Sequence, residues 1–183
     1  MGAESACIKT LLNLAITAER LDRLEQAADF VEECRALCRG DEETGELAEV
    51  LQVAGDIQLS LGNLEVAREN LERSFRLDLR LGRHLVLPEM MCSLARLAHG
   101  FEDWRGGAFF CGVAQAAAQK YRAPLSSRSA RSLEKLRGSC QEHLGEMLFQ
   151  ENLRRGETAS PEQWMEALLE TGRGTLAVRG HLH

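Results

Sequence analysis

Two cysteines four residues apart, Cys34 and Cys38, could place two thiolates on one side of a helix, as a metal site requires. A structural metal site needs further ligands, and no second pair of cysteines or histidines with ligand spacing accompanies these two. Four of the six cysteines fall at or near helix positions where a small apolar residue would also fit: Cys34, Cys92, Cys111 and Cys140. The sequence therefore favours thiols packed in a core, and it predicts neither a metal site nor a cofactor.

Four arginines recur at intervals of three, four and three residues and form a stripe on one face of a predicted helix: Arg73, Arg76, Arg80 and Arg83. Such a stripe could bind an anion. Glu69 and Glu72 lie one turn before the first two arginines, so pairing at the i,i+4 spacing offsets part of the positive charge. We expect a charge-compensated, solvated helix face rather than an anion site.

Asp78 lies on the same predicted helix, where the corresponding positions of the neighbouring repeats hold Cys38 and Ala118. A carboxylate at a position that otherwise carries small side chains needs water or a partner. Two interpretations remain open: Asp78 lies at an exposed end of the helix interface, or it forms an ion pair with Arg80.

No catalytic signature stands out in the sequence. We find no nucleophile paired with a base, no carboxylate pair in a defined setting, and no GxxxxGK[ST] phosphate loop. The closely spaced acids Glu42, Glu43, Glu46 and Glu49 suit the solvated first turns of a helix, where negative charge is favourable. The sequence predicts a protein that is not an enzyme.

The elements that position these residues form a repeat, because one pattern of large and small apolar side chains recurs every 40 residues. A fixed period of this length is typical of stacked helix pairs, each of which buries its apolar face only against a neighbour. Five sets of equivalent positions carry the pattern, and their side chains are predicted to lie on the packed faces of the helices: Leu11, Leu51 and Met91; Leu14, Ala54 and Leu94; Ala15, Gly55 and Ala95; Ala27, Ala67 and Gly107; Val31, Leu71 and Cys111.

Composition supports an all-α fold. The 183 residues are 44% hydrophobic but only 5% aromatic, which suits helices packed through leucine and alanine better than a β-sheet. The formal net charge of −6 argues against direct binding of nucleic acid, because phosphate contacts need a basic surface. No apolar run reaches the roughly 20 residues of a membrane-spanning helix, and no secretory segment opens the sequence. We expect no membrane partner, a cytoplasmic location and free thiols.

The predicted organisation has three parts. An array of three helical hairpins comes first, irregular capping helices follow where the period stops, and a glycine-rich flexible tail ends the sequence. The predicted bounds are 1–123 for the array, with hairpins at about 3–39, 44–82 and 85–122, then 124–171 for the capping helices and 172–183 for the tail.

Local signals mark several helix ends. Gly62 suits a turn that needs a positive φ, whereas Gly55 lies inside a helix and indicates close approach of a facing helix. Ser160 and Gln163 have the spacing of a capping box, with Pro161 at the first helical position. Gly106 lies inside a predicted helix, and nothing in the sequence explains it.

The order Leu51, Ala54-Gly55, Gly62-Asn63, Ala67 and Leu71 resembles the tetratricopeptide repeat, although the usual period is 34 residues rather than 40. The longer period and the segments Glu102–Ala108, Tyr121–Leu125, His143–Phe149 and Ala159–Gln163 resemble the C-terminal repeat arrays of large bacterial signal-transduction ATPases and of LuxR-type or SARP-type regulators. The resemblance implies a right-handed superhelix of antiparallel hairpins closed by a C-terminal helical cap. It also implies non-catalytic protein recognition in bacterial signalling or transcription regulation.

In arrays of this family the first helices of the pairs line a concave groove that binds a peptide or protein segment. The resemblance places twelve residues in such a groove here: Lys9, Leu12, Asn13, Ile16, Glu19, Glu49, Gln52, Asp56, Glu89, Cys92, Arg96 and His99. Two alternatives stay open. The groove could hold a small molecule or signal peptide, or the protein could be a structural unit that forms a homo-oligomer through Ile8, Leu12 and Ile16 of its N-terminal repeat.

Overall fold

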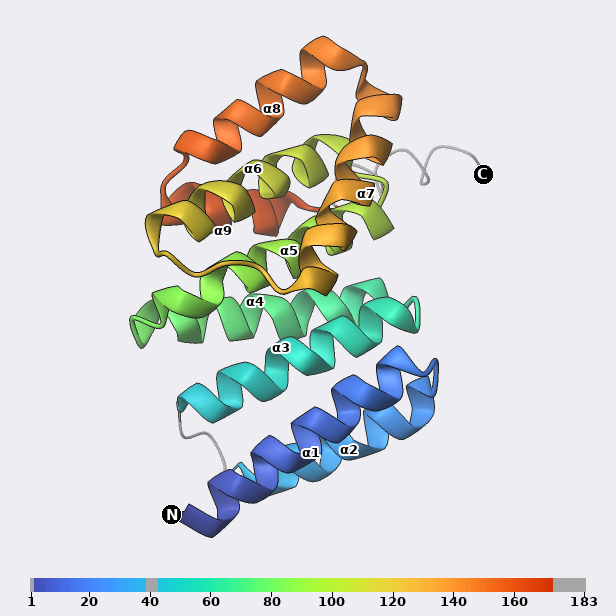
Figure 1. Cartoon of the computed structure of the whole chain (residues 1–183), viewed down its shortest axis with the longest axis vertical. Helices are drawn as coiled ribbons and strands as arrows, with labels where there is room; N and C mark the ends of the chain where they lie inside the picture. The colour runs from blue at the N-terminus through green and yellow to red at the C-terminus, as the bar shows by residue number, and fades with distance from the viewer. Residues whose placement is uncertain (1, 39–42, 173–183) are drawn as a thin grey trace. The chain divides into compact units, whose positions relative to one another are not determined.

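The computed structural model describes residues 2–38 and 43–172, and within these ranges the chain is helical, with no strand (Figure 1). The predicted all-α, tetratricopeptide-like helical fold is confirmed. The helices are α1 (Gly2–Arg20), α2 (Leu24–Leu37), α3 (Gly45–Ser60), α4 (Leu64–Arg80), the short 3₁₀ helix η1 (His84–Val86), α5 (Leu87–Gly100), α6 (Trp104–Lys120), α7 (Ser127–Leu144), α8 (Glu146–Thr158) and α9 (Pro161–Glu170).

The chain divides into two compact units, Met1–Arg83 and His84–His183. In the N-terminal unit α1 packs on α2 and α3 packs on α4, and α3 also contacts both helices of the first pair. In the C-terminal unit α6 is the central helix, because α5, α7, α8 and α9 all contact it. Consecutive helices joined by tight turns run antiparallel, as the ribbon of each pair shows in Figure 1.

The turns repeat with the same 40-residue period as the side chains. Asp22, Gly62 and Glu102 each have a positive φ, at 59°, 81° and 59°. Glycine adopts this conformation without the steric cost that a β-carbon adds. The positive φ that was predicted for Gly62 is therefore confirmed. Asp22 and Glu102 accept the strained conformation because the helix pairs on either side fix the turn.

Helices α1 and α3 lie side by side and run in the same direction. The Ser5 hydroxyl, near the start of α1, donates to a carboxylate oxygen of Glu46 at 2.7 Å. At the other end of the helices the Ser60 hydroxyl donates to Glu19 at 2.9 Å. Both pairs are separated by 41 residues, so the two helices are held in one register along their length.

The core of the N-terminal unit differs from the prediction on α1. The buried stripe of this helix consists of Ile8, Leu12, Ala15 and Ala18, whereas Leu14, predicted on the packed face, is 44% exposed. Both α2 and α3 contact α1, so its buried face turns toward the space between them and takes in Leu12. Leu14 lies on another side, although its equivalent Ala54 is buried against the first helix pair.

Two glycines let α6 and α8 cross backbone to backbone in the C-terminal unit. A β-carbon at Gly112 would lie 2.1 Å from the carbonyl oxygen of Leu153. A β-carbon at Gly156 would lie 2.0 Å from the carbonyl oxygen of Phe109. The absence of a side chain at both positions is therefore what allows this approach.

Other glycines confirm or explain the sequence pattern. A β-carbon at Gly55 would lie 2.6 Å from Cγ of Leu71, as close helix packing requires. Gly106 is explained by the N-cap of α6: its backbone N–H donates to the Asp103 carboxylate at 2.9 Å. A β-carbon at Gly106 would lie 2.3 Å from the other oxygen of the same carboxylate. The cap and the glycine are thus one local structure.

The C-terminal helices begin at side-chain caps. Ser126 caps α7, and Ser160 with Gln163 forms the predicted capping box of α9. Helix α8 continues to Thr158. Phe149 and Leu153 form its buried face, whereas Met147 and Leu148 are 83% and 36% exposed.

We expect Ser160→Ala to destabilise the C-terminal unit by about 1 kcal/mol, because the hydroxyl is replaced by a methyl group that cannot accept from the N–H of Gln163. The C-terminal unit contains both tryptophans, Trp104 and Trp164, so urea unfolding followed by tryptophan fluorescence measures its stability. Ser127→Ala, at an exposed position in the first turn of α7, is the control. Equal effects of the two substitutions would show that the Ser160 cap contributes nothing.

The sequence also suggests a glycine C-cap at Gly40; this residue and the predicted tail beyond Gly172 lie outside the described residues. Gly172 itself is buried, has a φ of 81° and lies against the ring of Phe101. Among the helices of the described ranges none is long and apolar enough to cross a membrane.

Candidate functional site

The twelve residues predicted to line a groove are divided between the two units. Eight lie on α1 and α3 of the N-terminal unit, and four lie on α5 of the C-terminal unit. Each set is described within its own unit.

Seven of the eight residues on α1 and α3 reach the surface, and we call them the first-helix surface: Lys9, Asn13, Ile16, Glu19, Glu49, Gln52 and Asp56. Lys9, Asn13 and Glu49 are exposed and the other four are partly exposed. Three carboxylates and a single lysine give this surface a negative charge. The parallel alignment of α1 and α3 places these side chains on two neighbouring rows.

Two of the predicted groove residues are buried, and their assignment is wrong. Leu12 is 2% exposed because it belongs to the stripe that α1 packs against α2 and α3. Cys92 is 4% exposed, on a helix that α6 and α7 both contact. A buried side chain cannot line a groove, so both are core residues.

The carboxylate of Glu89, on α5, is hydrogen-bonded to the start of α7. The backbone N–H of Ser126 donates to one Glu89 carboxylate oxygen at 2.6 Å, and the Ser129 hydroxyl donates to the other. These bonds join the N-terminal turn of a capping helix to the α5 face that was predicted to bind a partner. Arg96 and His99, the other two partly exposed residues of the four predicted in this unit, lie further along α5.

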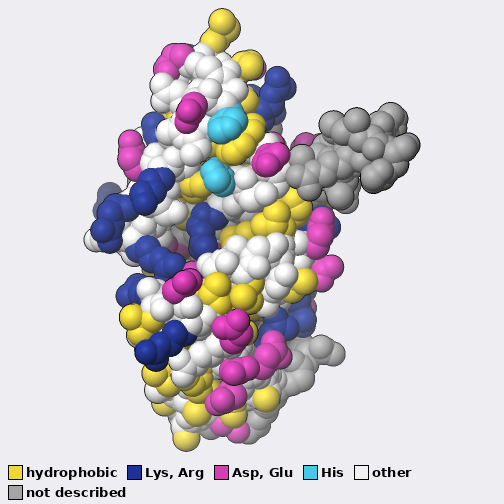
Figure 2. Space-filling model, turned by 90° about the vertical axis from the view of Figure 1, so that its right-hand side faces the viewer, with side chains coloured by type: hydrophobic (Ala, Val, Ile, Leu, Met, Phe, Trp, Pro, Cys, Tyr) yellow, Lys and Arg dark blue, Asp and Glu magenta, His cyan; other side chains and the backbone are white. Residues whose placement is uncertain are grey.

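His99 belongs to an aromatic cluster with Trp104 and His143. The rings of Trp104 and His143 are stacked, with centroids 3.8 Å apart and planes 11° apart. The His99 ring meets Trp104 edge-on at 5.1 Å. Histidine and hydrophobic side chains lie next to one another on the face shown in Figure 2. The cluster joins the end of α7 to the α5–α6 turn, so His99 has a packing role.

The N-terminal helix does not offer the predicted oligomer surface. Ile8 is 4% and Leu12 is 2% exposed, because both side chains pack inside the unit. Of the three residues predicted to mediate self-association, Ile16 alone is partly exposed. A homo-oligomer that uses Ile8 and Leu12 is therefore excluded as long as the unit stays folded.

Ion pairs compensate part of the arginine stripe, as predicted, although Arg83 follows the end of α4 at Arg80 instead of lying on the helix. Arg76 pairs with Glu72 at 2.8 Å, and Arg80 pairs with Glu43 at 2.6 Å. Arg83 pairs with Asp78 at 3.1 Å, so the proposed partner of Asp78, Arg80, was wrong. Asp78 is also not at an exposed end, because it is 2% exposed.

The cysteines predicted for the core, Cys34, Cys92, Cys111 and Cys140, are all buried. Burial raises the pKa of Cys34 and of Cys140 to about 11, so both remain thiols near neutral pH. In the part of the chain that the structure describes, no three or more acidic, histidine or cysteine side chains form a group that could hold a metal ion.

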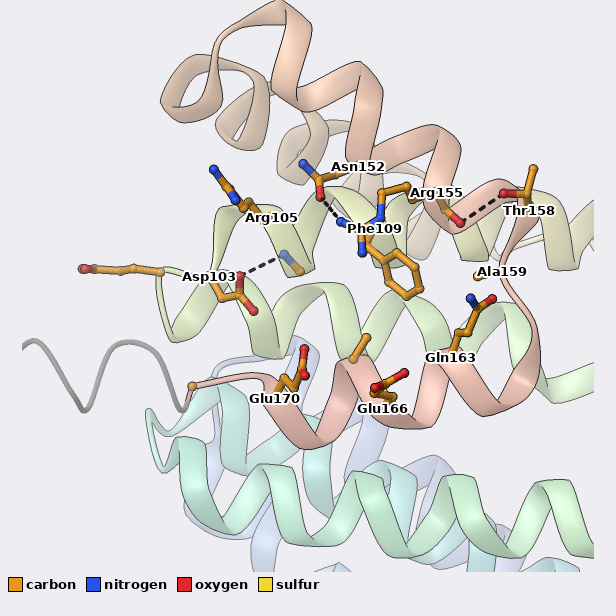
Figure 3. Close-up of a pocket in the computed structure, with 14 residues that line it drawn as sticks. Asp103, Arg105, Phe109, Asn152, Arg155, Thr158, Ala159, Gln163, Glu166 and Glu170 are labelled. Carbon is orange, nitrogen blue, oxygen red and sulfur yellow. Dashed lines mark hydrogen bonds between the residues drawn. The ribbon is translucent and has the colours of Figure 1, made fainter.

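A pocket that the sequence did not predict lies in the C-terminal unit. It has a volume of about 1070 Å³ and lies between the start of α6, the second half of α8 and helix α9 (Figure 3). Phe109 forms an apolar part of its wall and is 8% exposed. The charged side chains that line it are Glu102, Asp103, Arg105, Arg155, Glu166 and Glu170.

The walls of the pocket differ in charge. Glu166 and Glu170 lie one turn apart on α9 and face Asn152 and Arg155 on α8 across the hollow, with Phe109 between them (Figure 3). The Asn152 amide donates to the carbonyl of Leu148 at 2.8 Å, and its oxygen accepts from Arg155 at 3.3 Å. These bonds orient Arg155 along the pocket wall.

The carboxylates of the pocket are close enough to interact. Burial raises the pKa of Asp103, and the negative charge of Glu170 raises it further. The hydrogen bond from Gly106 and the charge of Arg105 act in the opposite direction. The acidic side of the pocket therefore carries negative charge in a partly desolvated setting.

Residues 4–80, which span α1 to α4, match the family model of the tetratricopeptide repeat. No curated protein and no solved structure matches the chain. The match supports a tetratricopeptide-repeat protein, and repeats of this kind present extended surfaces for binding other proteins.

Proposed function

We propose that the protein is a non-catalytic interaction module and that the first-helix surface of its N-terminal unit binds a peptide or protein segment with basic side chains. The observation that supports this most is the presence of three carboxylates and one lysine at exposed or partly exposed positions of two helices held in register, within the segment that matches the tetratricopeptide repeat. The acidic balance favours a basic partner by charge complementarity.

We propose that this module acts in bacterial signalling or transcription regulation, because the 40-residue period and the C-terminal segments resemble those of regulator arrays. The cytoplasm is the proposed location, in keeping with cysteines that form no disulfide among the described residues. Direct nucleic-acid binding and a membrane partner are not part of the proposal.

Glu49→Gln with Asp56→Asn tests the surface, because the double substitution removes two negative charges and keeps side-chain size. Peptides selected from a random library on the purified protein should be enriched in arginine and lysine. We expect their affinity to fall at least tenfold in this variant, measured by fluorescence anisotropy, and to weaken with added salt.

Glu25→Gln with Asp29→Asn is the matched control, since these exposed acids lie on α2 and the net charge changes equally. The control should leave affinity within about twofold of the starting protein. Selection of peptides without basic residues, or equal losses in both variants, would rule out this surface as the binding site.

A further inference from the structure

We propose that the pocket between α6, α8 and α9 is a second binding site, which takes an arginine or lysine side chain of a peptide segment. This site lies in the C-terminal unit and is independent of the first-helix surface. Three properties of the pocket support this assignment: its shape, the distribution of charge over its walls and its apolar wall residue.

The pocket is concave and large enough for a side chain together with the adjacent main chain. Its volume of about 1070 Å³ is slightly larger than that of ordinary ligand sites, which span about 300–1,000 Å³. Three separate helices contribute to its walls, and α6 contacts both of the others. The walls are therefore held by packed elements.

The acidic side selects a cation. Asp103, the N-cap of α6, lines the same hollow as Glu166 and Glu170 of α9 (Figure 3). A guanidinium or ammonium group among them would offset the repulsion between Asp103 and Glu170. Phe109 offers an apolar and aromatic surface for the methylene stem of such a side chain.

The arginines of the pocket favour a peptide over a free amine. Arg155 on α8 and Arg105, two residues after Asp103, line the same pocket as the carboxylates and supply hydrogen-bond donors for carbonyl groups. A polyamine would satisfy the acids but present only further cations to these two arginines. A peptide segment carries both the cation and the carbonyl acceptors, so it matches both kinds of pocket residue.

The test uses an acetylated and amidated hexapeptide with one central arginine between glycine and leucine residues, and the same peptide with citrulline in place of arginine. Binding to the full chain is measured by isothermal titration calorimetry. We expect the arginine peptide to bind at least tenfold more tightly than the citrulline peptide, because citrulline keeps the shape of the side chain and removes its charge.

Glu166→Gln with Glu170→Gln should weaken binding of the arginine peptide at least tenfold. Both side chains are exposed, so the substitutions leave the helix packing in place. Glu142→Gln with Glu151→Gln, two exposed acids of the same unit that do not line the pocket, is the matched control and should leave affinity unchanged.

Three outcomes would overturn the proposal: no binding of the arginine peptide at millimolar concentration, equal binding of the citrulline peptide, or equal affinity in the two double variants. Spermidine that binds as tightly as the peptide would overturn the peptide assignment in favour of a small-amine site. Glu49→Gln with Asp56→Asn should bind the hexapeptide unchanged, which separates this site from the first-helix surface.

Discussion

Gly112→Ala or Gly156→Ala is expected to destabilise the C-terminal unit by about 3 kcal/mol or more. At both positions a β-carbon would overlap a backbone carbonyl oxygen of the opposite helix, at 2.1 Å from Leu153 and 2.0 Å from Phe109. Overpacking in a well-packed core costs about 1–3 kcal/mol, and here the contact is with backbone that no rotamer change can move. The helices α6 and α8 would have to separate.

Gly138→Ala is the control for this prediction. Gly138 also lies inside a helix, α7, but a β-carbon there meets nothing within 4 Å. An alanine at such a position stabilises by about 0.5–1 kcal/mol, because glycine loses more backbone entropy on folding. The same chemical change should therefore give opposite signs at the two kinds of site.

Urea unfolding followed by tryptophan fluorescence measures these effects in the C-terminal unit alone, since Trp104 and Trp164 both lie there. If Gly112→Ala were as stable as Gly138→Ala, the result would contradict the close crossing of α6 and α8. Because Phe109 also lines the pocket, we expect both clashing variants to lose the binding of the arginine peptide as well.

Arg83→Met is expected to destabilise the N-terminal unit by about 3 kcal/mol at pH 7. Arg83 pairs with the buried Asp78 and also donates to the carbonyl oxygen of Gly45, so it joins the end of the second helix pair to the start of α3. Removing one partner of a buried pair costs about 3–5 kcal/mol, because the other charge is left uncompensated. The partial exposure of Arg83 favours the lower end of that range.

The effect of Arg83→Met should depend on pH. Burial raises the pKa of Asp78 to about 6 from 3.8, while Arg83 lowers it and Glu49 raises it. Between these two values the folded protein binds a proton that the unfolded chain does not, so this carboxyl favours folding more strongly as the pH falls from about 6 toward 4. Removing Arg83 raises the folded pKa further and strengthens this trend.

The difference in stability between the starting protein and Arg83→Met should therefore shrink on acidification from pH 7 to pH 5, measured by far-UV circular dichroism in urea. It should not vanish, because the bond to Gly45 is lost at every pH. Asp78→Asn with Arg83→Met should be more stable at pH 7 than Arg83→Met alone.

Arg76→Met removes an exposed pair and should cost less than about 1 kcal/mol at either pH. A loss in Arg83→Met that is equal to the control, or independent of pH, would contradict the buried pair.

Local features of the fold could be predicted from sequence because they depend on a few adjacent residues. The capping box at Ser160 and the positive φ of Gly62 are of this kind. The burial of Leu12 and Cys92 could not be predicted in this way. A helix with apolar residues at both 11 and 12 has a wide apolar face, and the contacts with α2 and α3 decide which side chain is buried. That choice is made by tertiary packing.

The pocket and the Asp78 pair depend on residues distant in the chain. Asp103, Arg155 and Glu170 meet only after α8 and α9 have packed on α6. One signal was present in the sequence, since Glu166 and Glu170 share a face of α9 with no arginine or lysine on that helix to compensate them. The bond between Glu89 and the N-terminus of α7 was not predicted for the same reason, because Ser126 follows Glu89 by 37 residues.

The serine–glutamate bonds at both ends of α1 and α3 prevent one helix from sliding along the other. The carboxylates of the proposed interface are consequently held at fixed intervals along the two helices. The surface would therefore select a partner by the spacing of its positive charges. Moving one arginine of an extended ligand by a single position should lower the affinity more than exchanging that arginine for lysine.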